Sequence, residues 1–540
     1  MRNNKILSII IIFFLVAGLV GYFAGLFIDV TRDSGKYATV AKEIYQHGNF
    51  INLTVHGEAY DQKPPMLFWL GAIGFYIGHI SNFWFKFPVF ILVLAGFYWT
   101  FRLGESLYNR KIGLLAAFLV FSSFIYSLYS MDIHTDTPLQ AFVTLALWQL
   151  YEFIKTGKNK YFVWGFTAIG LSMLSKGPLG AAIPAFAVVG HLLFKKDYKR
   201  FLDFRWYVGI LISLVVVSPA LIGLMNQFGR NGLYFFFWQN MVGRITGSYV
   251  STGNDPFFYF HNLFYQLLPW SILFLIIAFI DIRDLVKNKF RATEYFTFAG
   301  IWIYFIILSA SDSQLPNYIF TIVPLMAVLM AKWIYFAFKE RPKMFKVFLS
   351  VQNIITVLLW VGVFVISFYL FPGVKMLYWG VILIAALSTF YVFTNVKNQL
   401  IRLLAPSSII SLCLVLLLNL HVYPYIFSFQ APPKAGRYFT ENAAKNDTLY
   451  NYRYGQYELF FYSEPEAVQL LYNYNEMKSV ASKKGTWIFT DALGYQDILE
   501  LKVKPDTVIQ FQHFYLNRGA QFILPSNREK SLHQMYLVRF

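Results

Sequence analysis

The sequence predicts a polytopic, all-α membrane protein with about thirteen transmembrane helices and a small extracytoplasmic α/β domain at its C-terminus. Three observations lead to this fold class. The 540 residues are 57% hydrophobic and only 14% charged, whereas soluble domains have about 25% charged residues. Long apolar windows recur through residue 421, and basic residues gather in alternate loops between them. After residue 421 the long apolar windows stop and polar residues become frequent.

The predicted spans occupy most of residues 5–421. The first, 5–28, follows Arg2 and Lys5, and its apolar stretch is longer than the signal-peptide core of about 7–15 residues, so we expect an uncleaved anchor. The other spans are expected near 83–104, 111–130, 136–155, 160–176, 178–195, 205–225, 261–282, 295–311, 318–337, 347–371, 375–394 and 401–421. The single cysteine, Cys413, lies in the last of them, so no disulfide can form within the chain.

Lys and Arg residues give these spans a direction. Basic residues precede the first span and recur in alternate loops, near 102–111, 155–160, 195–200, 283–291, 339–346 and 397–402. Because Lys and Arg in short loops mark the cytoplasmic side, thirteen crossings place the N-terminus in the cytoplasm and the C-terminus outside the plasma (inner) membrane. Most of the net charge of +18 is therefore orientation charge. No basic cluster carries the interleaved aromatic residues of a nucleic-acid groove, so we expect no nucleic-acid partner.

Composition divides the chain into a transmembrane part, 1–421, and a soluble part, 422–540. Within the first part, the charged loop 29–82 is expected to contain an amphipathic helix at 34–47 that lies in the membrane interface. Its apolar face would carry Tyr37, Val40, Ala41 and Ile44. In the second part, β-rich pieces at 485–491 and 535–540 alternate with polar helical stretches near 434–446 and 470–483, which is typical of a small α/β domain.

Polar side chains gather at the predicted outer ends of the spans. They are Asp29, Arg32, Asp33, Tyr37 and Lys63 in the loop 29–82; Asp132, His134 and Asp136; Lys176 in a turn between two spans; and the segments 238–244, 254–256 and 313–318. Ionisable groups at membrane depth are costly and by default mark a functional site. A helix cap explains Asp136 equally well, and loop solvation or capping explains Asp132, His134 and Asp255 better than catalysis does.

Together these groups offer two acids and three bases, Lys63, Lys176 and Arg244. A carboxylate can deprotonate an acceptor hydroxyl, and Lys and Arg stabilise phosphate oxygens. Beside a membrane, this combination suits glycosyl transfer from a lipid-phosphate sugar. The phosphate leaves as an anion, so the general acid of glycoside hydrolysis is not needed. A transporter also gathers charges at one depth, so both functions stay open at this point.

A series of short motifs in roughly residues 1–340 is similar to the motifs of a known protein family. The motifs are Asp33-Ser34-Gly35-Lys36-Tyr37-Ala38, Gly57-Glu58-Ala59-Tyr60 leading to Lys63-Pro64-Pro65, Asp136-Thr137-Pro138-Leu139, Ser175-Lys176-Gly177-Pro178, Arg244 after Phe237-Trp238, Leu267-Leu268-Pro269-Trp270 and Leu315-Pro316-Asn317-Tyr318. In this order, they make the chain resemble the GT-C class of membrane glycosyltransferases. The branch is that of dolichyl-phosphate-mannose–protein mannosyltransferases and bacterial lipid A aminoarabinose transferases.

The resemblance implies a polyprenyl-phosphate sugar as donor substrate, an outward-facing active site and inversion at the sugar carbon. Asp33 would orient or deprotonate the acceptor and Asp136 would support the site. The donor phosphate would be held by Lys63, Lys176, Arg244 and Tyr318. Tyr37 belongs to the first acidic motif, and Asp29, one helical turn before Asp33, is a rival for the base. The implied partners are the lipid bilayer, the polyprenyl-linked sugar and an acceptor lipid, glycan or protein.

Two positions depart from the family pattern. Aminoarabinose transferases tend to carry Glu just before the Lys-Pro pair and Glu-His before the Arg, whereas this chain has Gln62 and Asn240-Met241. Without these ligands we expect no zinc and no cofactor, a divalent metal stays open without support from the sequence, and the case for lipid A as acceptor is weaker.

Two other functions compete with glycosyl transfer. A transporter or flippase of a polyprenyl-linked or anionic substrate should show two related halves and spans broken at mid-membrane, and the sequence shows no such symmetry. An assembly scaffold would leave the acids without a purpose. The sequence therefore favours the glycosyltransferase.

Overall fold

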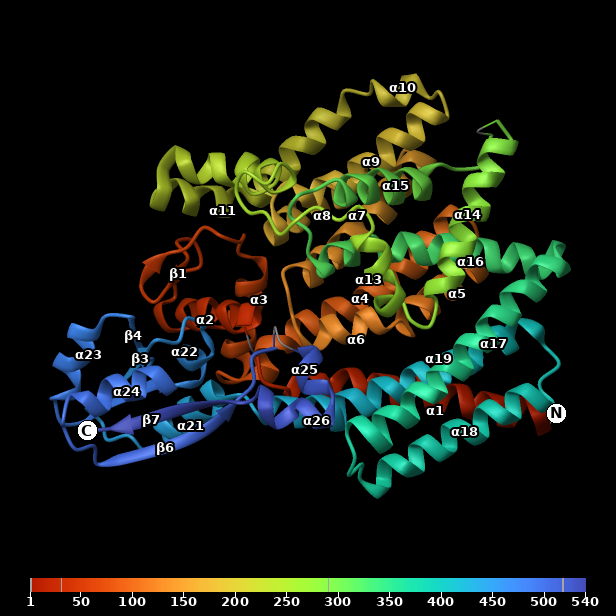
Figure 1. Ribbon diagram of the computed structural model, residues 1–540. Coiled ribbons are helices and arrows are strands. Elements are labelled where there is room, and N and C mark those ends of the chain that lie inside the picture. The colour runs from red at the N-terminus through yellow and green to blue at the C-terminus, as the bar shows by residue number, and fades with distance from the viewer. Residues whose placement is uncertain (1, 31, 290, 517–518) are drawn as a thin grey trace.

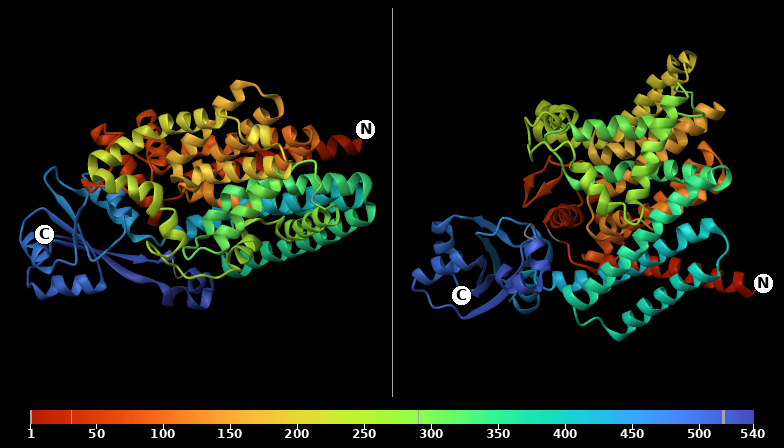
Figure 2. Two further views of the ribbon diagram at one scale, coloured as in Figure 1. Left: turned by 90° about the horizontal axis from the view of Figure 1, so that it is seen from above. Right: turned by 45° about the vertical axis from the view of Figure 1, so that its right-hand side comes forward.

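The computed structural model describes residues 2–30, 32–289, 291–516 and 519–540 (Figure 1). Residues 2–427 form a bundle of helices, and a five-stranded sheet with short helices follows. The sheet lies at one end of the bundle and the N-terminus at the other, as all three views show (Figure 2). The fold class predicted from the sequence, a helical membrane protein with a small C-terminal α/β part, is confirmed.

The helices of the first part are α1 Arg2–Ala24, α2 Arg32–His47, α3 Met66–Ile77, α4 Asn82–Leu107, α5 Arg110–Phe121, α6 Phe124–Met131, α7 Asp136–Thr156, α8 Asn159–Lys176, α9 Leu179–Phe194, α10 Tyr198–Phe201, α11 Arg205–Tyr234, α12 Val242–Ile245, α13 Phe258–Gln266, α14 Ser271–Lys287, α15 Phe296–Ser309, α16 Val323–Glu340, α17 Pro342–Phe364, α18 Met376–Asn395, α19 Gln399–Leu417 and α20 Tyr423–Phe427. Several of them are extended by 3-10 helical segments, η1 Gly25–Phe27 and η3 Pro316–Ile322, and by π-helical segments, η2 Phe235–Gln239, η4 Val365–Leu370 and η5 Leu418–Val422. A small antiparallel hairpin, β1 Thr54–Val55 and β2 Glu58–Ala59, precedes α3.

Each predicted span contains helical structure, but not every helix is long enough to cross a bilayer alone. In the described ranges seven helices are long and apolar enough, or eight when the pair α5 and α6, bent by 54°, counts as one span. The apolar helices α9 and α15 have only 16 and 14 residues, whereas a straight span needs about 20. The structure therefore confirms a multi-pass membrane protein, and the number thirteen remains a prediction.

Local sequence explains where several helices begin and end. The side chain of Asn109 accepts hydrogen bonds from the backbone N–H groups of Lys111 and Ile112 and so caps the start of α5. Gly157, with φ of +70°, ends α7 in the left-handed conformation that glycine adopts without strain. By contrast, residues 323–331 of α16 are buried on all sides, which is expected of a helical segment that is apolar all round and lies at the centre of a bundle.

The packing of α3 on α4 depends on a glycine. A Cβ built on Gly74 of α3 would lie 1.9 Å from the carbonyl oxygen of Trp84, far inside van der Waals contact. We therefore expect Gly74→Ala to lower the free energy of unfolding by about 1–3 kcal/mol or more, the usual cost of overpacking. Thermal unfolding in detergent measures this effect.

Gly380 of α18 provides the matched control, since a Cβ there would meet no atom within 4 Å. Gly380→Ala should raise stability by about 0.5–1 kcal/mol through helix propensity alone. Equal melting temperatures for the two variants would contradict the proposed close contact.

The C-terminal part contains α21 Ala431–Asn442, β3 Thr448–Tyr452, α22 Glu458–Tyr462, β4 Val468–Leu471, α23 Tyr474–Ala481, β5 Thr486–Asp491, α24 Ala492–Glu500, β6 Thr507–His513, α25 Gly519–Ile523, α26 Pro525–Arg528, η7 Glu529–Ser531 and β7 His533–Arg539. The strand order is β4-β3-β5-β7-β6, with β3 parallel to β4 and β5, and β7 antiparallel to β5 and β6. Strands and helices appear where the sequence predicts them. The last long helix continues to Phe427, six residues past the predicted boundary at 421, and the division into domains remains a prediction.

The loop 29–82 is folded and covered, and the predicted helix at 34–47 begins at Arg32. It does not lie open in an interface, because it packs between α3 and the C-terminal α22, and even Lys42 and Glu43 are buried. Lys42 Nζ donates to the carbonyl oxygens of Phe460 and Ser463 at 2.9 and 2.7 Å. The amphipathic pattern of α2 could not predict these contacts, because they join segments more than 400 residues apart in sequence. The second helix in the loop, α3, was not predicted.

Candidate active site

A buried ion pair joins α7 to α8 at the centre of the candidate site. Asp136 is the first residue of α7 and Lys176 the last of α8, and their side chains are 1% and 8% exposed. Lys176 Nζ lies 2.6 Å from Asp136 Oδ1, and Asn317 Nδ2 donates to Asp136 Oδ2 at 2.6 Å. Both carboxylate oxygens thus serve tertiary contacts, so helix capping, the alternative for Asp136, is not its main role.

An aromatic side chain and a guanidinium extend this centre. Lys176 Nζ lies 3.8 Å from the ring centroid of Tyr318, a cation–π contact. The Tyr318 hydroxyl accepts a hydrogen bond from Arg244 Nη1 at 3.4 Å. Arg244 Nε in turn donates to Asn240 Oδ1 at 2.9 Å. Residues from four distant segments, predicted from separate motifs, therefore meet in one cluster.

A mostly apolar cavity of about 420 Å³ opens beside these cations. Lys176, Arg244 and Tyr318 line one part of it, and apolar side chains of α9 and α15 line the rest. Such a cavity can hold an anionic head group on the cations and a hydrocarbon chain against the helices.

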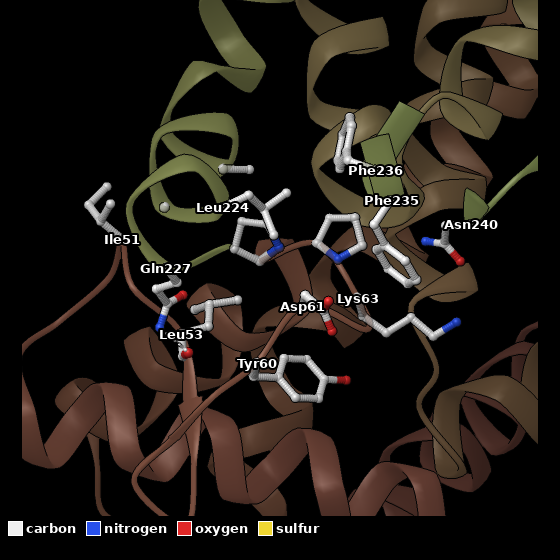
Figure 3. A pocket seen from close by; sticks show the side chains of 14 residues that line it. Ile51, Leu53, Tyr60, Asp61, Lys63, Leu224, Gln227, Phe235, Phe236 and Asn240 are labelled. Carbon is white, nitrogen blue, oxygen red and sulfur yellow. Dashed lines mark hydrogen bonds between the residues drawn. The ribbon is translucent and has the colours of Figure 1, made fainter. Parts of the chain in front are cut away.

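Lys63 lies on the other side of the cluster, in a small cavity lined by Tyr60, Asp61 and the α11–η2 segment (Figure 3). Phe236 and Asn240 line both cavities. In Figure 3 the Lys63 amino group and the Tyr60 hydroxyl extend in the same direction, below Asn240. Burial, together with repulsion by Lys176 and Arg244, lowers the pKa of Lys63 to about 7, although Asp136 and Asp33 act in the opposite sense. Lys63 forms no hydrogen bond or ion pair with any residue in the described ranges, so its amino group is available to a ligand.

Asp33 and Tyr37 approach the same centre from α2. Asp33 is exposed in the first turn of the helix, and its charge raises the pKa of Lys63. Tyr37 is 4% exposed and packs edge-on against the ring of His134. The structure thus brings together Asp33, Tyr37, Lys63, Asp136, Lys176, Arg244 and Tyr318.

Asp29 does not join this group. Its carboxylate pairs with Arg437 of α21, with 3.1 Å between Oδ2 and Nη1, and also accepts a hydrogen bond from Asn82 Nδ2 at 2.8 Å. Asp29 therefore holds the C-terminal part against the bundle. This placement leaves Asp33 as the better candidate for the base.

Asp132 and His134, for which the sequence favoured a loop role, form an ion pair of 3.1 Å next to the site. Burial disfavours the imidazolium, but Asp132, Asp33 and Asp136 outweigh that effect and raise the pKa of His134. Asp255 instead organises its loop, since its Oδ1 accepts from Phe257 N–H. Asn317 and Asn240 belong to the sequence motifs but were not predicted as site residues, because an uncharged amide does not by itself indicate a functional site.

Sequence comparisons find a family and several relatives that are similar to part of this chain. Residues 62–222 match the sequence model of the dolichyl-phosphate-mannose-protein mannosyltransferase family. An uncharacterised protein of Aquifex aeolicus (strain VF5) is 28% identical over 301 residues, 55% of this chain and 58% of that protein. The undecaprenyl phosphate-alpha-4-amino-4-deoxy-L-arabinose arabinosyl transferase of Shewanella sediminis (strain HAW-EB3) is 25% identical over 321 residues, 58% of this chain and 57% of that protein. The chain thus spans somewhat more than half the length of these curated relatives.

Solved structures extend the likeness to nearly the whole chain. ArnT from Cupriavidus metallidurans in the apo state matches 91% of this chain and 94% of its own with a TM-score of 0.71 at 15% identity. The same protein bound to undecaprenyl phosphate matches 98% of this chain and 97% of its own with a TM-score of 0.73 at 14% identity. The chain has the GT-C fold of ArnT.

The matched family model and the fold shared with ArnT agree with the resemblance that the motifs suggested. The residues that match the mannosyltransferase model include Lys63, Asp136 and Lys176, whereas Asp33, Arg244 and Tyr318 lie outside them. The candidate site therefore combines residues of the matched segment with residues of α2, α12 and η3, which lie outside it.

Proposed function

We propose that the chain is a membrane glycosyltransferase that moves a sugar from a polyprenyl-phosphate donor to an acceptor hydroxyl or phosphate, with inversion at the sugar carbon. The observation that carries the proposal is the position of three basic side chains around one centre: Lys176 and Arg244 line the apolar cavity, and Lys63 lines the small cavity beside it. A polyprenyl phosphate has this combination of an anionic head and a long apolar chain.

The residues of the site divide the reaction between them. Lys63, Lys176 and Arg244 hold the phosphate, and Asp136 holds Lys176 in place through the 2.6 Å ion pair. Asp33 accepts the proton of the acceptor as its oxygen attacks the sugar carbon. The bond from that carbon to the phosphate oxygen breaks on the opposite face, and the polyprenyl phosphate leaves as an anion. The step requires no cofactor and no metal at this site, where the positions beside Lys63 and Arg244 are Gln62, Asn240 and Met241.

The proposal also assigns the sides of the membrane. The N-terminus lies in the cytoplasm, and the site and the C-terminal part face outward from the plasma (inner) membrane. The reason is that Lys and Arg gather in every second short loop, and such loops stay on the cytoplasmic side. The acceptor is a lipid, a glycan or a protein of the cell envelope.

Release of labelled sugar tests the function directly. Purified protein in detergent is incubated with undecaprenyl-phosphate-linked hexoses or pentoses and an envelope extract, and mass spectrometry identifies the product. We expect free undecaprenyl phosphate and a glycosylated acceptor. The same protein reconstituted in lipid vesicles provides the counter-test: movement of intact donor across the bilayer, with no cleavage in either assay, would contradict the proposal and support a flippase.

The pKa of Lys63 predicts how donor affinity depends on pH. The phosphate binds the ammonium form, and with a pKa of about 7 this form is lost as pH rises. Donor affinity should therefore be highest below pH 7 and fall by up to about fivefold between pH 7 and 8. Titration of the donor at a series of pH values measures this change.

Lys63→Arg is the control, because arginine stays charged throughout this range. Its donor affinity should vary less with pH than that of the wild-type protein. An identical pH profile in both proteins would show that another group, such as His134, is responsible.

A further inference from the structure

A second cluster of potential ligands lies outside the candidate active site. Glu43 of α2, His56 between β1 and β2, and Glu466 of the C-terminal part each offer one ligand atom, and these three atoms lie within 4.8 Å of one another. His56 Nδ1 is 3.3 Å from Glu466 Oε1. In the described ranges no other group of three His, Cys, Asp or Glu residues meets this criterion. Imidazole nitrogen and carboxylate oxygen are common ligands of zinc, at about 2.0–2.2 Å.

The hairpin holds His56 in an unusual backbone conformation. His56 and Gly57 have φ of +56° and +73°, the conformation of a tight hairpin turn in which Asn or Gly is the usual first residue. A non-glycine residue at positive φ is uncommon, so a histidine at this position suggests that its imidazole has a role. Its ring stacks on Tyr457 with centroids 5.2 Å apart and planes at 5°, and it also contacts Phe460. Such packing fixes the orientation of a ligand ring.

The charges around His56 favour a divalent cation. Glu43 is 4% exposed, and its carboxylate accepts hydrogen bonds from Thr54 Oγ1 and His56 N–H, both neutral donors. Glu466 is 20% exposed, and Glu464, which is more exposed, lies 3.7 Å from Lys42 Nζ. Lys42 interacts electrostatically with all three carboxylates, and a second ammonium group, Lys36 Nζ, lies 4.9 Å from the ring centroid of Tyr457. With a neutral imidazole the three carboxylates still outnumber these two ammonium groups, and a partly buried site compensates excess negative charge by binding a cation.

We propose that Glu43, His56 and Glu466 bind a divalent transition-metal ion of the zinc class, with water completing the coordination. The ion joins α2 and the neighbouring β1–β2 hairpin to the C-terminal part, which lies about 400 residues farther along the chain. Lys63 follows the hairpin by only four residues, so the ion also steadies the segment that carries it. The expectation of no zinc rested on the positions of Gln62 and Asn240-Met241, and this cluster lies elsewhere. The proposed metal site does not depend on the proposed glycosyl transfer.

Metal analysis of the full-length protein tests the site. The protein is purified in detergent, stripped with a chelator and titrated with ZnCl2 against a chelating dye. We expect one tightly bound zinc per chain and a higher melting temperature with zinc. Wild-type protein that binds no zinc and keeps its melting temperature would overturn the proposal and leave only a His56–Glu466 ion pair.

Two variants make the assignment specific. Asparagine tolerates the positive φ of position 56, and Glu466 is a partly exposed loop residue, so His56→Asn and Glu466→Gln should both fold. Each should weaken zinc binding at least tenfold, whereas His79→Asn, which changes an exposed histidine elsewhere, should bind as the wild type does. Unchanged zinc affinity in His56→Asn and Glu466→Gln would refute the site even if the protein contains zinc.

Discussion

Asp33→Asn should abolish sugar transfer while leaving donor binding intact. Asparagine keeps the size and polarity of the side chain but cannot take a proton, so the rate should fall by about 10²–10⁴-fold, the usual contribution of a general base. Asp33 is exposed at the start of α2, so the substitution should not disturb the fold. Turnover of a labelled undecaprenyl-phosphate sugar, measured beside equilibrium binding of undecaprenyl phosphate, separates the two effects.

Asp29→Asn is the informative comparison, because Asp29 was the rival candidate for the base. In the structure Asp29 pairs with Arg437 and Asn82, so its loss should lower the melting temperature and reduce turnover much less than Asp33→Asn does. The reverse result, with full activity in Asp33→Asn and none in a folded Asp29→Asn, would exchange the two roles.

Lys176→Ala should weaken donor binding and also destabilise the protein. Removing the lysine leaves the 1% exposed carboxylate of Asp136 with Asn317 as its remaining hydrogen-bond partner. An uncompensated buried charge of this kind costs about 3–5 kcal/mol of unfolding free energy. Unfolding in detergent and binding of undecaprenyl phosphate measure the two consequences, and Lys158→Ala in an exposed loop should show neither.

The double variant Asp136→Ala/Lys176→Ala distinguishes support of the fold from binding of the phosphate. Removing both charges should recover much of the lost stability, since no unpaired ion then remains. Donor affinity should stay low, because the cation itself is missing. A double variant that regains both properties would mean that Lys176 serves the fold alone.

The sequence predicted most of the helices because a bilayer imposes a simple rule on them. Apolar windows at 83–104 and 136–155 became α4 and α7 almost residue for residue, since each helix satisfies its own backbone hydrogen bonds. Prediction was weaker at α3, a 12-residue apolar helix shorter than a span. It also could not foresee that α2 is covered by α22, because this contact joins segments more than 400 residues apart.

The candidate site shows the same division. Motifs identified Asp33, Lys63 and Lys176 as candidates, and charge at a membrane surface gave the physical reason to suspect them. They did not show that Asp136 pairs with Lys176, that Asn317 completes this pair, or that Asp29 is engaged by Arg437. Each of these facts depends on a distance between helices, which no local pattern encodes.

The sequence by itself therefore determined that this is a helical membrane protein and which charged residues are candidates, because solvent preference is a property of each residue and its near neighbours. Only the tertiary structure decided which charges meet, that Lys63 titrates near neutrality, and that Glu43, His56 and Glu466 come together. The physical reason is that electrostatic energies depend on separation and burial, and both are set by contacts between distant segments.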